Sequence, residues 1–201
     1  MWASLALVAA LLAALAGADA SYAELLGYQE GSLRTVKCKG GGYFNGIEAS
    51  FANLNGFNEK VVIGIRLRCS TGKLDLEYAG EVDDGYEFGA NFDTGSLLSA
   101  ACPPGKGLAG IVWRRGEVQG KDDQAWRPGG MKVYCGTETL SPMTMDNHMG
   151  KTYSLREVDC SHTPNPPAAT EERRVVELEV WQEVDWVGLR FLRCEPSTQA
   201  T

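Results

Sequence analysis

The chain has 201 residues, of which 22% are charged, and a formal net charge of −7 at pH 7. This acidic balance argues against nucleic acid binding and against electrostatic attachment to anionic membranes, because both need a basic footprint. The chain has 2 histidines and no C-x-x-C motif, so a structural zinc site is not expected, and no other cofactor is indicated.

The first 20 residues, "MWASLALVAALLAALAGADA", form an apolar run that ends in a small-x-small pattern. This pattern is typical of a signal-peptidase site, and the run is short for a bilayer span. We therefore predict a signal peptide over residues 1–20, secretion, and a single extracellular domain over residues 21–201 with no membrane insertion.

The cysteine spacing indicates an internal repeat. Successive cysteine pairs are separated by 31, 33 and 34 residues, and an even number of cysteines in a secreted chain predicts disulfide bonds. The predicted bonds lie within each unit and join an opening strand to the closing strand of the same sheet: Cys38–Cys69, Cys102–Cys135 and Cys160–Cys194.

In the first two units, glycines lie at the same distances in sequence from the cysteines. The matching positions are Gly41 with Gly105, Gly46 with Gly110, Gly56 with Gly120, and Gly64 with Gly130. Matched glycines imply matched backbone shapes, because glycine is kept where φ is positive or where another segment approaches closely. We predict repeats over about 30–70, 95–136 and 153–195; the third has lost most of these glycines.

Each unit has the pattern of β-structure. Apolar and polar residues alternate in "IGIRLRC", "GMKVYC" and "VVELEVW", while "DDGYEFG", "CPPGKG" and "RPGG" have the composition of turns. No segment of the mature chain shows sustained helical periodicity. The sequence therefore predicts an all-β domain in which three antiparallel sheets close in a pseudo-threefold arrangement that hides their edges.

These residues resemble the vitelline membrane outer layer protein I family. The likeness is carried by Cys38, Gly41, Gly46 and "GIRLRC" in the first unit, and by "CPPGKGLAGI", "QGKDD" and "GMKVYC" in the second. It implies a disulfide-stapled, three-repeat β-prism, a structural role in an egg coat, and a fold likened to carbohydrate-binding lectins. The chain departs from the family in "FGANFDTGSLLSA", which replaces a tryptophan-rich strand, and its third unit matches poorly.

A weaker likeness is to dermatopontin, a protein of the extracellular matrix. It is carried by "GLAGI" and "DDQAWRPGGMKVYC". Both resemblances imply an extracellular role in a coat or matrix.

Asp122, Asp123 and Trp126 are the predicted binding residues. Carboxylates accept hydrogen bonds from sugar hydroxyls, and an indole ring can stack on a pyranose. Two carboxylates could also hydrolyse a glycosidic bond across a suitable gap, although neighbours in sequence often point apart. The alternative for these three residues is an acidic turn at a sheet corner, with the tryptophan packed at its rim.

Other motifs favour structural explanations. Asp93-Thr94-Gly95-Ser96 is similar to the catalytic loop of aspartic proteases, but that chemistry needs a second such loop. The loop is expected to be a surface turn in a connector before Cys102. His148 near Asp146 has no nucleophile motif to complete a hydrolase.

The leading hypothesis is a secreted structural or interaction protein of an extracellular coat or matrix, with glycans or matrix and coat proteins as partners. The alternatives are a weak glycosidase or glycosyltransferase that acts on amino-sugar oligosaccharides, and a dermatopontin-like adhesion protein.

Overall fold

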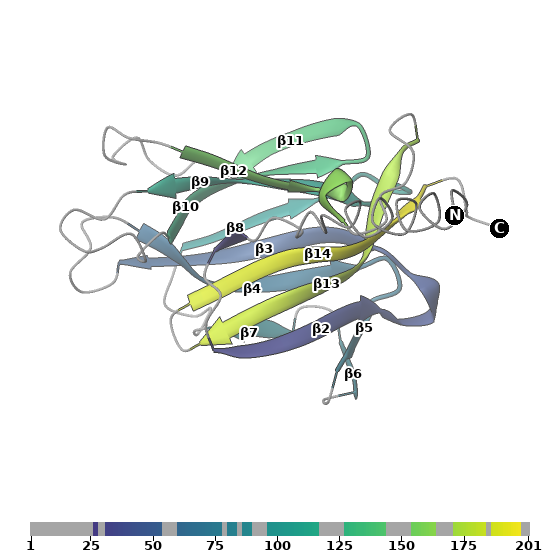
Figure 1. Cartoon of the computed structure of the whole chain (residues 1–201), viewed down its shortest axis with the longest axis horizontal. Helices are drawn as coiled ribbons and strands as arrows, with labels where there is room; N and C mark the ends of the chain where they lie inside the picture. The colour runs from purple at the N-terminus through teal and green to yellow at the C-terminus, as the bar shows by residue number, and fades with distance from the viewer. Residues whose placement is uncertain are drawn as a thin grey trace, which may run out of the picture.

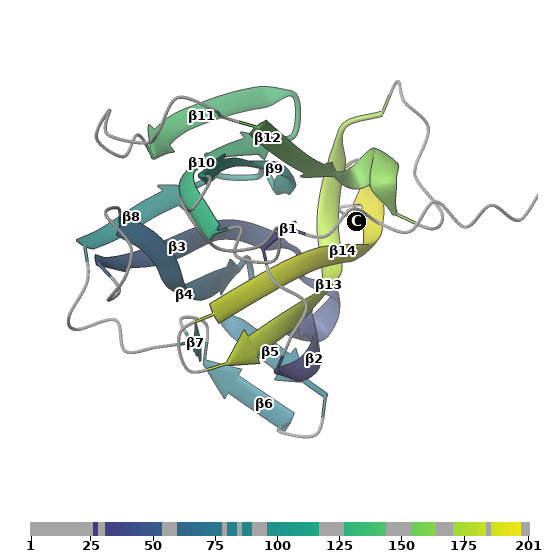
Figure 2. The ribbon, with the colours of Figure 1, turned by 60° about the vertical axis from the view of Figure 1, so that its left-hand side comes forward.

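The computed structural model describes ten segments of the chain: residues 26–27, 31–53, 60–77, 80–83, 86–89, 96–116, 127–143, 154–163, 171–183 and 186–197. Within them the chain is almost entirely β-strand, in three antiparallel sheets. The predicted fold class, an all-β pseudo-threefold prism stapled by disulfides, is confirmed. The sheets surround a common centre, as Figures 1 and 2 show from two directions.

The three sheets share one strand order. A hairpin occupies the middle of each sheet, an outer strand pairs with the hairpin's second strand, and a further strand pairs with its first. The second sheet contains β7 (Glu87–Gly89), β4 (Lys60–Cys69), β3 (Phe44–Asn53) and β8 (Ser96–Ala101). The third sheet contains β11 (Glu138–Met143), β10 (Arg127–Cys135), β9 (Leu108–Gly116) and β12 (Ser154–Asp159).

The first sheet is completed by both halves of the chain. Its hairpin is β13 (Arg173–Glu183) and β14 (Trp186–Pro196), flanked by β1 (Leu26–Gly27) and β2 (Ser32–Cys38). It is extended by β5 (Lys73–Leu76) and β6 (Gly80–Asp83). Two 3-10 turns, η1 (Lys39–Gly41) and η3 (Cys160–His162), follow β2 and β12. The hairpin of the third unit, β13 and β14, thus holds the same place in its sheet as the other two hairpins, although the third unit lacks most of the matched glycines.

The core lies between the three sheets. Each hairpin contributes a cross-strand pair of fully buried side chains at the same register: Ile47 with Leu67, Ile111 with Val133, and Leu178 with Phe191. These residues have the alternating pattern predicted from the sequence, so one face of each strand is apolar and points inward. Burial of such a side chain stabilises the fold by about 1.5–3 kcal/mol.

The disulfide bonds join the predicted cysteines, but not within one sheet. In the described segments no cysteine is free, and the bonds are Cys38–Cys69, Cys102–Cys135 and Cys160–Cys194. Cys38 ends β2 in the first sheet, whereas Cys69 ends β4 in the second. The expectation of a bridge within each sheet was wrong, because the strand before each opening cysteine pairs with the hairpin of the preceding unit. The three bonds therefore link the sheets in a ring.

The matched glycines do share backbone shapes at two of the predicted pairs. Gly41 and Gly105 both have positive φ, at 75° and 82°. An added Cβ would lie 2.8 Å from the Ala100 carbonyl oxygen at Gly46 and 2.9 Å from Tyr134 Cδ2 at Gly110. At both positions a neighbouring strand crowds the glycine, with its backbone at Gly46 and with a tyrosine ring at Gly110.

Some predicted turns are strands. Residues 102–107, "CPPGKG", do form a loop, but "RPGG" opens β10 and "EFG" in "DDGYEFG" is β7. Ser96, the last residue of the protease-like motif, begins β8 rather than ending a connector. These segments are parts of the sheets. They were predicted as turns because they are rich in glycine, proline and aspartate.

Candidate functional site

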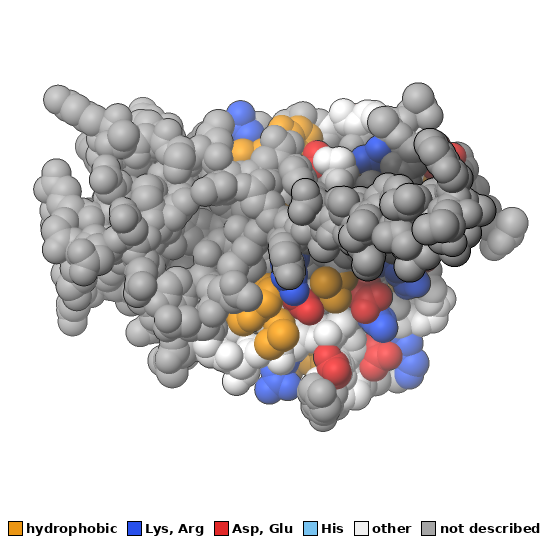
Figure 3. Space-filling view, viewed as in Figure 1, with side chains coloured by type: hydrophobic (Ala, Val, Ile, Leu, Met, Phe, Trp, Pro, Cys, Tyr) orange, Lys and Arg blue, Asp and Glu red, His pale blue; other side chains and the backbone are white. Residues whose placement is uncertain are grey.

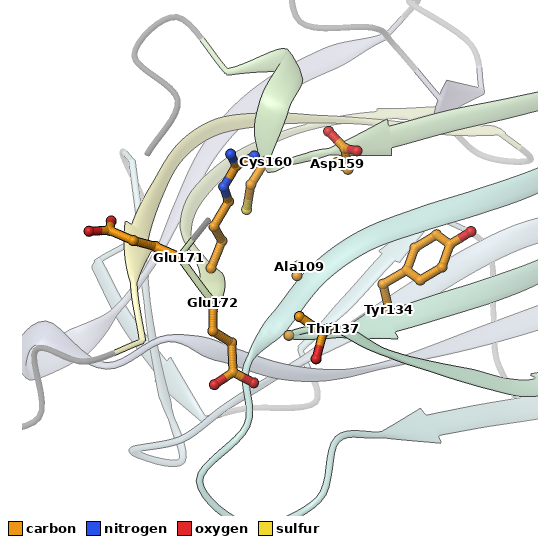
Figure 4. A pocket seen from close by; sticks show the side chains of 9 residues that line it. Ala109, Tyr134, Thr137, Asp159, Cys160, Glu171 and Glu172 are labelled. Carbon is orange, nitrogen blue, oxygen red and sulfur yellow. The ribbon is translucent and has the colours of Figure 1, made fainter. Parts of the chain in front are cut away.

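A pocket of about 330 Å³ opens where the first and third sheets meet. Figure 4 shows Ala109, Tyr134 and Thr137 on one side of it and Glu171 and Glu172 on the other. The lining residues come from β9, β10 and the turn after it, the end of β12, and the start of β13: Ala109, Tyr134, Gly136, Thr137, Asp159, Cys160, Glu171, Glu172 and Arg173.

The turn after β10 shapes the floor of the pocket. Gly136 has φ 61°, and its N–H donates to the Gly107 carbonyl at 3.0 Å. A Cβ on Gly136 would lie 2.1 Å from Glu172 Oε1, so the carboxylate can approach only because this residue is glycine. Two of the three disulfides hold the surrounding strands, because Cys135 ends β10 and Cys160 lines the pocket.

The carboxylates of the pocket have defined partners. Asp159 Oδ1 accepts the backbone N–H of Ser161 at 2.6 Å and also the Ser161 hydroxyl. Glu172 pairs with Lys106, and this hydrogen bond raises the pKa of Lys106 above its ordinary value. The pocket thus combines carboxylate acceptors, a hydroxyl, a phenol ring and Arg173, which suits a polar ligand rich in hydroxyl groups.

Outside the pocket, charged side chains on the outer faces of the sheets pair with one another. Glu48 opposes Arg66 in the second sheet, and Glu179 opposes Arg190 at the equivalent register in the first. A hydrogen bond to Glu87 raises the pKa of Arg66 above its ordinary value, and Glu48 adds to the effect. In Figure 3 acidic and basic side chains are interleaved in this way on the coloured part of the surface.

Four arginines of β4 and β14 have carboxylate partners: Arg66, Arg68, Arg190 and Arg193. They therefore behave as paired strand-face residues. The Arg190 guanidinium also lies 5.1 Å from the ring centre of Trp181. Trp181 is buried on the outer face of its sheet, opposite Gly188.

The predicted binding residues Asp122, Asp123 and Trp126 lie outside the described residues, as do His148 and Asp93 to Gly95. The pocket instead uses residues beside the cysteines that sequence reasoning did not single out. Asp159 precedes Cys160 and Tyr134 precedes Cys135, while Glu171 and Glu172 come directly before β13. Tyr134 and Asp159 come together because both lie opposite Gly110 of β9, so strand pairing places them at the pocket and no local motif marks them.

The part of the chain that the structure describes contains no cluster of three or more histidine, cysteine, aspartate or glutamate side chains suited to a metal ion. It also contains no helix long and apolar enough to cross a membrane.

No protein-family model and no curated protein matches the sequence. Solved structures do match in three dimensions. Calystegia sepium agglutinin has 13% identity and a TM-score of 0.49, covering 87% of this chain and 97% of its own. A prostate-specific WGA16 glycoprotein lectin has 11% identity and a TM-score of 0.49, covering 86% and 96%.

A mannose-specific jacalin-related lectin from Morus nigra has 11% identity and a TM-score of 0.47, covering 85% of this chain and 92% of its own. At these identities and TM-scores the matches do not assign a family or a ligand to this chain. The resemblance to vitelline membrane outer layer protein I stays a prediction.

Proposed function

We propose that this protein is a secreted structural component of an extracellular coat or matrix that binds carbohydrate at one end of its prism. The observation that carries the proposal is the ring of three disulfides, each of which links two different sheets. Such bonds persist in oxidising compartments and are rare in the cytosol. A domain cross-linked by three such bonds is suited to a long lifetime outside the cell.

The carbohydrate part of the proposal rests on the pocket. Asp159, Glu171 and Glu172 supply acceptors for sugar hydroxyls, and Tyr134 supplies an aromatic ring. The resemblance to vitelline membrane outer layer protein I adds an egg coat as the setting and β-linked amino-sugar polymers as the first ligands to try.

The binding proposal is tested with the oxidised chain without residues 1–20, on a glycan array and in pull-downs with polysaccharides. We expect retention on at least one β-linked amino-sugar polymer. The double substitution Glu171→Ala and Thr137→Ala should weaken it about tenfold or more, because it removes two exposed hydrogen-bonding groups of the pocket. The control is Asp75→Ala, which removes an exposed carboxylate on β5. No binding to any such polymer, or equal losses in both variants, would remove the proposal.

The second candidate is glycoside hydrolysis, which the three carboxylates in one pocket favour. Hydrolysis needs one carboxyl group as acid and a second as base or nucleophile across the bond. Incubation of the same polymers with the protein distinguishes the two functions. Shortened chains that disappear with Glu172→Gln would indicate an enzyme, whereas intact polymer that stays bound indicates a lectin-like role.

A further inference from the structure

Three residues at the disulfide end of the prism hold equivalent positions in the three units. Tyr43, Gly107 and Arg174 each come directly before the buried hairpin residue that pairs with a closing cysteine. These pairs are Phe44 with Cys69, Leu108 with Cys135, and Val175 with Cys194.

These three residues meet one another. A Cβ on Gly107 would lie 2.5 Å from Arg174 Cβ and 3.0 Å from Tyr43 Cδ2. The Arg174 guanidinium carbon lies 4.6 Å from the ring centre of Tyr43. Equivalent residues in mutual contact surround the pseudo-threefold axis, so Arg174 sits at the axial end of the core. Glycine at position 107 leaves the room that the arginine and tyrosine occupy.

Arg174 is a buried cation that has no carboxylate partner among the residues the structure describes. The residue is 6% exposed, and its Nε is buried with no hydrogen-bond partner among the described residues. The nearest acidic residues along the strands, Glu172 and Glu195, pair with Lys106 and Arg193 instead. The Tyr43 ring offsets part of the cost of burying a charge, but a ring accepts none of the guanidinium's hydrogen bonds in its plane.

Glycines stand in two of the loops that lead to this position. Gly40 and Gly41 lie between Cys38 and Tyr43, and Gly105 lies between Cys102 and Gly107. A Cβ added to any of the three would meet no atom within 4 Å. These glycines therefore border open space rather than packed side chains.

We propose that the disulfide end of the prism binds one anionic group, a carboxylate or a sulfate, against Arg174. The guanidinium offers parallel N–H donors in a fixed plane, which match two oxygens of either group. The site is separate from the pocket beside it, whose lining includes Asp159, Glu171 and Glu172, and it does not depend on carbohydrate binding there.

The experiment is equilibrium dialysis of the oxidised chain at low ionic strength, with radiolabelled sulfate in one arm and radiolabelled acetate in the other. We expect saturable binding of one anion per chain by the unmodified protein in at least one arm. The arm that saturates at the lower concentration identifies the group. Arg174→Met should abolish binding, and Arg174→Lys should weaken it about tenfold, because lysine lacks the planar pair of donors.

The matched control is Arg193→Met, which removes a half-exposed arginine already paired with Glu177 and Glu195. It should bind as the unmodified protein does. If Arg174→Met does not fold, Arg174→Lys carries the comparison. Binding that is unchanged in the Arg174 variants, or absent from the unmodified protein in both arms, overturns the proposal and leaves Arg174 a packing residue.

Discussion

Arg68 Nε donates a hydrogen bond of 3.0 Å to Glu48 Oε1 across the hairpin of the second sheet. Glu48 is only 5% exposed, and its second oxygen lies 3.6 Å from Arg66 Nη1. A carboxylate on an outer sheet face is thus held between two arginines, with the Ser99 hydroxyl donating at 3.4 Å.

Glu48→Ala should lower the free energy of unfolding by about 1–3 kcal/mol, because it removes the carboxylate that accepts from Arg68 and one of the two carboxylates beside Arg66, which keeps Glu87. The measurement is urea denaturation followed by fluorescence. The control is Asp83→Ala, which breaks the pair with Lys73 where the Asp83 side chain is 81% exposed. Its cost should stay below about 0.5 kcal/mol. Equal losses in the two variants would contradict the importance of burial at Glu48.

Removal of one disulfide should destabilise the prism strongly, whichever bond is chosen. The three closed loops span 31, 33 and 34 residues, so the chain-entropy model gives nearly equal losses of about 3–4 kcal/mol. Guanidinium denaturation of the three double Cys→Ala variants measures this. A bond whose loss costs less than about 1 kcal/mol would show that the two sheets it joins are held by packing alone.

Alanine at Gly46 and alanine at Gly110 should destabilise the protein to different extents, because the atoms that crowd the two positions differ in how easily they move. Gly46→Ala forces a Cβ to 2.8 Å from a backbone oxygen of β8, whereas Gly110→Ala places it 2.9 Å from a ring atom of Tyr134. A ring can rotate aside, but a paired strand cannot. We expect Gly46→Ala to cost roughly 1–3 kcal/mol and Gly110→Ala about 1 kcal/mol less. The midpoints of thermal unfolding in the two variants test this order, and a reversal would contradict it.

The Lys106–Glu172 pair should leave a signature at alkaline pH. Because Glu172 raises the pKa of Lys106, the pair's contribution to stability is complete below the pKa of an unfolded lysine. It is lost as pH rises through the higher folded pKa. Carbon NMR of the methylated lysines should show one resonance that titrates late. Glu172→Gln should return it to the ordinary range, and a resonance that does not move would contradict the pairing.

Much of the fold could be predicted from local patterns. The alternation in "IGIRLRC" identified β4 because one face of that strand packs in the core, with Ile65 and Leu67 fully buried. Gly41 and Gly105 were informative for a similar reason, since each needs a positive φ that other residues rarely adopt. Such requirements belong to single positions and can be recognised without the rest of the chain.

The candidate site was not predictable in the same way. Tyr134, Asp159 and Glu172 lie far apart in sequence and share no motif, and they line one pocket because disulfides and strand pairing bring their sheets together. The residues that were predicted, Asp122, Asp123 and Trp126, were chosen by their chemistry and by a family resemblance. Carbohydrate binding by these three residues remains a prediction, in addition to the pocket.

The spacing of cysteines and glycines by itself determined that three equivalent β units are present, because disulfide reach and backbone conformation are local demands. Tertiary structure alone decided which sheet each opening strand joins. The backbone N–H and C=O groups of a strand can pair with any suitable sheet edge, so the residues of the strand do not determine which strand it pairs with. Here each opening strand pairs with the hairpin of the preceding unit, so each disulfide joins two sheets and the three bonds form a ring. The same pairing brings Tyr43, Gly107 and Arg174 together on the axis.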